Sequence, residues 1–187
     1  MYNKLDYWGS RKDPNSKLSK DTAHLQVEWT KKFINKKDSI LDYGPGVLRL
    51  VDLYKEVKKI NFYDISYQYK SIVEKKCNEN NIIIENYVVD DSGIIKTAFE
   101  DNQFDVVICS EVFLHSPDNE ILDLINELSR ISKKVIVTTW YENGESINSG
   151  HCWTRDYKKI LNENNFTIIH WEENLFNNKQ VGFIYKK

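Results

Sequence analysis

The sequence predicts an α/β fold: a doubly wound, mostly parallel, seven-stranded sheet with an antiparallel C-terminal hairpin. Short runs rich in β-branched residues alternate with segments of helical periodicity, which is typical of parallel βαβ units. Residues 104–109 (FDVVIC) are nearly continuously apolar, as a central strand buried on both faces must be. Near the C-terminus, two strand-like runs flank the Asn177-Asn178-Lys179 turn and predict the hairpin.

The first half of the chain is expected to hold an irregular arm followed by alternating helices and strands. Strands are expected at 39–43, 60–63 and 82–89, where β-branched and aromatic residues gather. Helices are expected at 47–56 and 67–78, and a further helix follows the capping candidates Ser19 and Asp21. Apolar residues at helical spacing support these helices: Leu25, Trp29, Phe33 and Ile34 in the helix after the arm, and Tyr69, Ile72, Val73 and Cys77 at 67–78.

The second half continues the same alternation. Strands are expected at 104–109, 134–139, 166–171 and 181–185. Thr154 is a candidate cap for a helix that carries Tyr157, Ile160 and Leu161. The helix expected at 119–132 has its apolar residues on one face, namely Ile121, Leu124, Ile125, Leu128 and Ile131.

Length and charge narrow the class of protein. The 187 residues fit one domain over 1–187, with an N-terminal arm of about 1–20 that could act as a lid. A net charge of −2 argues against a protein that clamps nucleic acid, which usually carries a basic face. Three widely spaced cysteines, no leader-like start and no long apolar stretch indicate a cytoplasmic protein with no membrane partner. The sequence does not distinguish a monomer from a homodimer.

A turn and an acidic residue predict a nucleoside site. In such sheets the ligand lies beyond the carboxyl ends of the strands. Gly44 and Gly46 follow the first strand, and without a Cβ they allow a tight bend and a close approach of ligand. A helix beginning at once after Gly46 would turn its positive end toward a carboxylate. Asp64 comes twenty residues after Gly44, the separation at which an acid reaches ribose hydroxyls.

The same turn argues against two other nucleotides. A dinucleotide fingerprint needs a third glycine at position 49, where the helix packs on the strand, and Arg49 stands there instead. The Gly-Lys-Ser/Thr of a Walker-type phosphate loop is also absent from the sequence. A ligand with an amino acid end and no pyrophosphate suits this shorter turn. The dinucleotide cofactor of a dehydrogenase does not suit it.

Two segments resemble the class I S-adenosylmethionine-dependent methyltransferases of the small-molecule type. Residues 40–46 (ILDYGPG) are similar to the first motif of that family, with Asp42 as its acidic residue. Residues 104–115 (FDVVICSEVFLH) are similar to its fourth-strand motif. The resemblance implies a Rossmann-like transferase with S-adenosyl-L-methionine as cofactor. One departure stands out, because Leu48 occupies a position where members often have a third glycine.

The resemblance also implies roles for individual residues. Asp64 would hold the ribose, and Ile65 would lie beside the adenine. Either Asp90 or Asp91 would lie near the adenine amino group, with Asp91 the one we select and the alternative left open. Asp42, Gly44 and Gly46 would shape the pocket, with Arg49 near the amino acid end of the cofactor and Ser110 close to its methyl group.

Candidate residues for the methyl acceptor come from three segments. His115 and His151 are candidate bases, and each is as readily interpreted as a structural histidine bound to the backbone. Aromatic side chains can wall a pocket or attract a sulfonium, and Trp140, Tyr141, Trp153 and the pair Tyr7 and Trp8 are such candidates. Arg11 in the arm is a candidate for meeting an anionic acceptor. No metal site is expected, since His151-Cys152 has no second pair at ligand spacing.

These observations lead to one expected function and two alternatives. We expect a methyltransferase that acts on an oxygen or nitrogen of a small polar metabolite. An RNA or protein acceptor is one alternative, although the chain leaves no room for a separate recognition domain. A non-catalytic S-adenosylmethionine-binding module is the other, suggested by Leu48.

Overall fold

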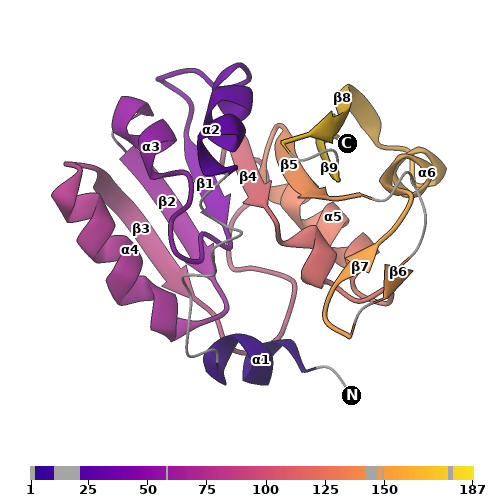
Figure 1. The fold of residues 1–187 in the computed structure, drawn as a ribbon, viewed down its shortest axis with the longest axis horizontal. Coiled ribbons are helices and arrows are strands. Elements are labelled where there is room, and N and C mark those ends of the chain that lie inside the picture. Colours follow the sequence, from indigo (N-terminus) through magenta and orange to yellow (C-terminus); the bar gives the residue numbers. More distant parts are fainter. Residues whose placement is uncertain (1–2, 11–21, 58, 142–146, 149, 177–178) are drawn as a thin grey trace. The chain divides into compact units, whose positions relative to one another are not determined.

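The computed structural model describes residues 3–10, 22–57, 59–141, 147–148, 150–176 and 179–187. The chain forms two compact units, Met1–Gly93 and Ile94–Lys187, and each is described by itself. Figure 1 shows the helices and strands with their labels. Within the described ranges, no helix is long and apolar enough to cross a membrane.

The first unit contains three parallel strands in the order β3-β2-β1. Its strands are β1 (Ile40–Tyr43), β2 (Lys59–Asp64) and β3 (Ile83–Val89). Its helices are α1 (Lys4–Ser10), α2 (Ala23–Lys31), α3 (Val51–Val57) and α4 (Tyr67–Glu79). All of β1 is buried, and α4 buries the expected face, with Tyr69, Val73 and Cys77 facing inward. The candidate caps Ser19 and Asp21 lie outside the described residues.

The third helix begins later than the sequence predicts, and this corrects one argument for the ligand turn. Residues 46–50 form turns, and α3 begins only at Val51. The cause is Leu48, whose φ of 55° is incompatible with a right-handed helix and whose N–H donates to Pro45 O at 2.8 Å. A helix N-terminus therefore does not directly follow Gly46. The side chain of Leu48 is fully buried, and packing it offsets the cost of the left-handed backbone.

The N-terminal arm contains the short helix α1, which the sequence did not predict. Trp8 in α1 contacts Tyr69 of α4 edge-on at 6.5 Å between ring centroids. Ser66 Oγ, just before α4, donates to the backbone carbonyl of Trp8 at 3.4 Å. Figure 1 shows α1 at the arrowhead ends of β2 and β3, the carboxyl ends of these strands. The arm is thus anchored where a ligand of the first unit would bind.

The second unit contains four strands in the order β4-β5-β9-β8 and a separate two-stranded ladder, β6-β7. Strands β4 and β5 are parallel, whereas β9 pairs antiparallel with both β5 and β8. The strands are β4 (Val106–Ser110), β5 (Val135–Trp140), β6 (Ile147–Asn148), β7 (Trp153–Thr154), β8 (Thr167–Leu175) and β9 (Gln180–Lys186). The helices are the 3-10 turn η2 (Phe113–His115), α5 (Ile121–Ile131) and α6 (Tyr157–Glu163). The seven strands of the two main groups confirm the predicted fold class.

The expected cap of the last helix is wrong by two residues. Thr154 lies in β7 and pairs with Ile147, so it does not cap α6. Asp156 is the N-cap, and its carboxylate accepts the N–H of Lys159 at 2.9 Å. An aspartate is at least as good a cap as a threonine.

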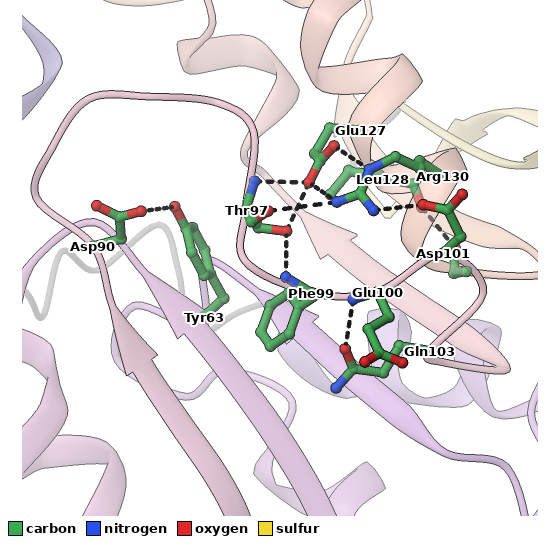
Figure 2. A network of polar contacts seen from close by, with 11 residues as sticks. Tyr63, Asp90, Thr97, Phe99, Glu100, Asp101, Gln103, Glu127, Leu128 and Arg130 are labelled. Atoms are coloured by element: carbon green, nitrogen blue, oxygen red, sulfur yellow. Dashed lines mark hydrogen bonds and ion pairs between the residues drawn. The ribbon is translucent and has the colours of Figure 1, made fainter.

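A partly buried polar network joins the segment before β4 to α5 (Figure 2). Glu127 is only 5% exposed, and its Oε1 accepts the N–H of Thr97 at 2.7 Å and its hydroxyl at 2.6 Å. Arg130 donates Nε and Nη2 to the same carboxylate at 2.8 and 2.7 Å, and its Nη1 to Asp101 at 2.7 Å. Burial would raise the pKa of Glu127, but the bonds from Arg130 and Thr97 outweigh it and hold that pKa below its ordinary value.

Candidate functional site

The glycine turn of the first unit has the backbone geometry that the sequence predicts. Gly44 and Gly46 have φ values of 77° and 51°, in the region that favours glycine. The N–H of Gly44 donates to Tyr63 O at 2.8 Å, which ties the turn to β2. A Cβ placed on Gly46 would meet no atom within 4 Å. The backbone at Gly46 therefore faces open space that a ligand can approach.

Asp64 is the last residue of β2, and it connects that strand to the turn. Its Oδ1 accepts the N–H of Ser66 at 2.9 Å and its Oδ2 that of Gly46 at 3.3 Å. Burial raises the pKa of Asp64 to about 6, although these amide bonds act in the opposite direction. Ile65 follows and is half-buried. The structure thus places a largely desolvated carboxyl group beside Gly46.

Asp42 on β1 is a second buried carboxyl group in the same unit. The hydroxyl of Tyr54 donates to its Oδ2 at 2.7 Å. Burial raises the pKa of Asp42 to about 7 despite the bond from Tyr54, and the charge of Asp64 adds to this rise. The positive charge of Arg49 lowers it again. Arg49 is therefore close enough to Asp42 to act on it, and its Nη1 donates to Gln26 Oε1 at 3.4 Å.

The pKa of Asp42 leads to a prediction about stability and pH. The folded-state pKa of about 7 exceeds the ordinary value of 3.8, so the folded protein binds this proton more tightly than the unfolded chain. The contribution of Asp42 to the free energy of unfolding therefore falls as pH rises from 3.8 toward 7. Between about pH 5 and about pH 8, the free energy of unfolding of the wild type should fall by about 2–3 kcal/mol relative to that of Asp42→Asn.

Urea unfolding of both proteins at several pH values measures this difference. Asp52→Asn is the matched control, because Asp52 is exposed on α3 in the same unit. Its pH profile should follow the wild type. Parallel profiles for the wild type and Asp42→Asn would show that the carboxyl group of Asp42 is not destabilised by burial.

The structure distinguishes between the two acidic residues after β3. Asp90 is half-buried, and its Oδ1 accepts the N–H of Ser92 at 3.0 Å. The hydroxyl of Tyr63 donates to Asp90 Oδ2 at 3.4 Å (Figure 2). The hydrogen bonds from Ser92 lower the pKa of Asp90 below its ordinary value. Asp91 is exposed, so the carboxylate that the structure orients at this strand end is Asp90.

The aromatic pair of the arm lies in the first unit. Tyr7 and Trp8 in α1 contact each other edge-on, with 5.0 Å between ring centroids. Trp8 also packs on Tyr69, as described above. Arg11, the third candidate of the arm, lies outside the described residues.

The second unit brings together the two histidines that the sequence offered as separate candidates. His115 ends η2, and its Nδ1 lies 2.9 Å from the backbone carbonyl of His151. The two rings are nearly parallel, 5.9 Å apart between centroids. Cys152 Sγ is 3.8 Å from the same Nδ1. A carbonyl only accepts, so Nδ1 of His115 carries the proton, and in the neutral ring Nε2 is the basic nitrogen.

The remaining candidates of this unit occupy different surroundings. Ser110, the last residue of β4, shares a hydrogen bond of 2.9 Å with Thr138 Oγ1. Trp140 ends β5 and is half-buried, whereas Trp153 in β7 is buried. Tyr141 contacts Trp171 edge-on at 5.6 Å. Trp153 is thus a packed residue, while Trp140 and Tyr141 retain exposed surface.

Sequence reasoning missed two functional candidates in the second unit. Glu111 follows β4 directly and has a φ of 59°. Its Oε1 accepts a hydrogen bond from Gln180 Nε2 at 2.8 Å. Arg155 is 4% exposed and binds the backbone carbonyls of Phe113 and Ser116. Arg155 therefore fixes the turn that carries His115. The position of Glu111 immediately after the fourth strand was the one signal available in the sequence.

Comparisons with known proteins agree with this geometry. A family model described as a methyltransferase domain matches residues 41–135. This range contains the glycine turn, Asp64 and the segment from β4 to α5. No curated protein sequence is significantly similar to the chain.

Solved structures resemble the chain over nearly its whole length. The PH0226 protein from Pyrococcus horikoshii OT3 is 16% identical with a TM-score of 0.73, and the match covers 100% of this chain and 99% of that one. Magnesium protoporphyrin IX methyltransferase (ChlM) from Synechocystis PCC 6803, with bound SAH, is 18% identical with a TM-score of 0.74, covering 98% of each. A SAM-dependent methyltransferase from Aquifex aeolicus is 18% identical with a TM-score of 0.68, covering 99% and 98%. At these identities the likeness establishes the fold.

Proposed function

Because this chain belongs to the methyltransferase domain family, we propose that it methylates an oxygen or a nitrogen of a small polar metabolite. The methyltransferase class expected from the sequence is confirmed by the family match. S-adenosylmethionine as the methyl donor is supported by the similar fold of magnesium protoporphyrin IX methyltransferase, whose structures contain SAH or SAM. The acceptor is the new part of the proposal. The observation that carries it is the His115 ring, whose basic nitrogen suits an acceptor that loses a proton.

Residues of the first unit fit the cofactor. Gly46 faces open space, and the buried Asp64 beside it offers carboxylate oxygens for ribose hydroxyls. Asp42, Gly44 and Gly46 would shape the pocket, and Arg49 would meet the carboxylate end of the cofactor. Ile65 would lie beside the adenine, with Asp90 rather than Asp91 at its amino group. The bound cofactor supplies a methyl group on a sulfonium that is already activated for transfer.

In the second unit, His115 would take the proton of the acceptor. Its Nδ1–H is held by the carbonyl of His151, so Nε2 is the nitrogen that can accept. We therefore assign the base to His115, and to His151 a positioning role through its backbone. Ser110 at the end of β4 would lie close to the transferred methyl group. A hydroxyl acceptor loses its proton as it attacks, and a protonated amine must lose one before it can attack.

Aromatic residues would complete the acceptor site. Trp140 and Tyr141 keep exposed surface at the end of β5, and a ring beside a sulfonium adds about 0.5–2 kcal/mol of cation–π attraction. Trp153 would support this wall from its buried position in β7. Tyr7, Trp8 and Arg11 of the arm would form a lid, with Arg11 facing an anionic group of the acceptor.

Isothermal titration with S-adenosylhomocysteine, with NADH as the control ligand, tests the cofactor half of the proposal. Binding at micromolar strength or better, about −8 kcal/mol, is expected for S-adenosylhomocysteine and no binding for NADH. Asp64→Ala should weaken the affinity several-fold, because the ribose hydroxyls lose their carboxylate partner. Asp52→Ala, an exposed acid of the same unit, is the control. An unchanged affinity in folded Asp64→Ala would contradict the role of Asp64.

A further inference from the structure

We propose that Lys76 of α4 is a positioning residue for the cofactor, because its ammonium group holds the backbone of the turn at residues 44–48 in the conformation that the cofactor meets. The proposal rests on the proposed function, since it assumes that this turn binds S-adenosylmethionine. It also accounts for Leu48, which stands where related methyltransferases often have a third glycine. The turn of this chain would thus depend on a side chain from a neighbouring helix.

The turn requires a left-handed backbone at alternate residues. Gly44, Gly46 and Leu48 have φ values of 77°, 51° and 55°. Glycine adopts this region as readily as negative φ, whereas a residue with a Cβ is strained there. Packing of the fully buried Leu48 side chain offsets part of this strain, and hydrogen bonds of the backbone supply further restraint.

The peptide group between Val47 and Leu48 is bound at both of its ends. It is trans and planar, so its C=O and its N–H point in opposite directions. The N–H of Leu48 donates to Pro45 O at 2.8 Å, inside the turn. On the other side, Lys76 Nζ donates to Val47 O at 2.5 Å. These two bonds fix the orientation of the peptide plane, and this orientation sets the φ of Leu48.

Rotation of this peptide plane is the simplest way for the turn to lose its strain. Half a rotation would return Leu48 to negative φ, the range that a residue with a Cβ prefers. It would also turn Val47 O away from Lys76 and the N–H of Leu48 away from Pro45. A charged donor makes a stronger hydrogen bond than a neutral one, and Lys76 is half-buried, which limits competition from water. The bond from Lys76 therefore opposes the rotation.

The rotation would disturb the surface that the cofactor is proposed to contact. Gly46 directly precedes Val47, and its N–H donates at 3.3 Å to Asp64 Oδ2, which belongs to the proposed ribose-binding group. The open space at Gly46 belongs to the same turn. A chain that spends part of its time in the rotated conformation binds the cofactor only through the remaining fraction. Lys76 would therefore raise the cofactor affinity through the turn rather than through a contact of its own.

Isothermal titration of the full chain with S-adenosylhomocysteine tests this role. Lys76→Met keeps the length of the side chain and removes the donor, so the affinity should fall about tenfold while the protein stays folded. Lys76→Arg keeps a charged donor and should retain the affinity to within about threefold. Lys75→Met is the matched control and should leave the affinity unchanged, because Lys75 is an exposed residue of the same helix and lies 3.9 Å from Glu79.

The Leu48→Gly background separates positioning from an attraction between charges. Glycine is not strained in the left-handed region, so adding Lys76→Met to Leu48→Gly should change the affinity by less than about threefold. A direct attraction of the Lys76 charge to the cofactor carboxylate would act equally in both backgrounds and would contradict the proposal.

A second ligand replaces this comparison if Leu48→Gly does not fold, since that variant loses a fully buried side chain. Methylthioadenosine has the nucleoside and lacks the carboxylate. Its affinity should fall in Lys76→Met by as much as that of S-adenosylhomocysteine, because the turn changes for both ligands. A loss confined to S-adenosylhomocysteine would show an attraction between charges and would contradict the proposal.

Failure of this role and failure of the proposed function give different results. If the wild type does not bind S-adenosylhomocysteine, the cofactor assignment fails and the role of Lys76 fails with it. If the wild type binds and Lys76→Met binds equally well, the role of Lys76 alone is refuted.

Discussion

His115→Ala is expected to lower kcat by about a hundredfold to ten-thousandfold while leaving the affinity for S-adenosylhomocysteine unchanged. In the proposed mechanism Nε2 of the neutral ring accepts the proton, since Nδ1 lies 2.9 Å from His151 O and donates to it. Without it the acceptor must lose its proton to water. Transfer of labelled methyl groups to an acceptor found by screening amines and alcohols measures the effect.

Two further histidine variants make this test specific. His151→Ala keeps the backbone carbonyl that holds His115, so its kcat should fall by less than about tenfold. His24→Ala is the control and should leave kcat unchanged, because His24 is exposed on α2. A large loss of kcat in His151→Ala with little loss in His115→Ala would exchange the two roles. No loss in either variant would mean that the acceptor needs no base from this pair.

Glu127→Ala is expected to lower the free energy of unfolding by about 1–3 kcal/mol. The variant leaves the guanidinium of Arg130 with Asp101 as its carboxylate partner in this network, and it removes the acceptor of both Thr97 donors (Figure 2). The cost arises at Thr97, which is 6% exposed and whose N–H and hydroxyl lose their acceptor. Urea unfolding measures the change.

The matched control is Glu163→Ala, since Glu163 is exposed on α6 and lies 3.9 Å from Lys159. An exposed pair of this kind contributes about 0.3–0.5 kcal/mol. If Glu127→Ala were no less stable than Glu163→Ala, the Thr97 donors would not depend on Glu127 for their hydrogen bonds.

The sequence was most informative where burial and periodicity coincide. The strands β4 and β5 are runs of apolar residues, and α4 and α5 repeat theirs on one face, so all were predicted within about two residues. The start of α3 was wrong because the positive φ of Leu48 leaves no periodic signal. The ladder β6-β7 pairs only two residues on each side, too few for alternation to show.

The residues of the candidate site also differ in whether the sequence could predict them. Asp42, Gly44 and Asp64 could be found because their spacing along the chain reflects a strand, a turn and the next strand. The contact of Glu111 with Gln180 joins residues 69 positions apart, and no local pattern marks such a pair. His115 and His151 were two independent alternatives in the sequence, and only folding shows that the backbone of one holds the ring of the other.

That main-chain contact has a consequence for engineering the acceptor site. The tautomer of His115 depends on a carbonyl at position 151, which every amino acid possesses. The side chain at His151 can therefore be randomised while the carbonyl that binds Nδ1–H of His115 is kept, with Cys152 left unchanged because its Sγ lies 3.8 Å from the same nitrogen. Such a library would vary the surroundings of the proposed base while Nε2 stays the nitrogen that can accept a proton.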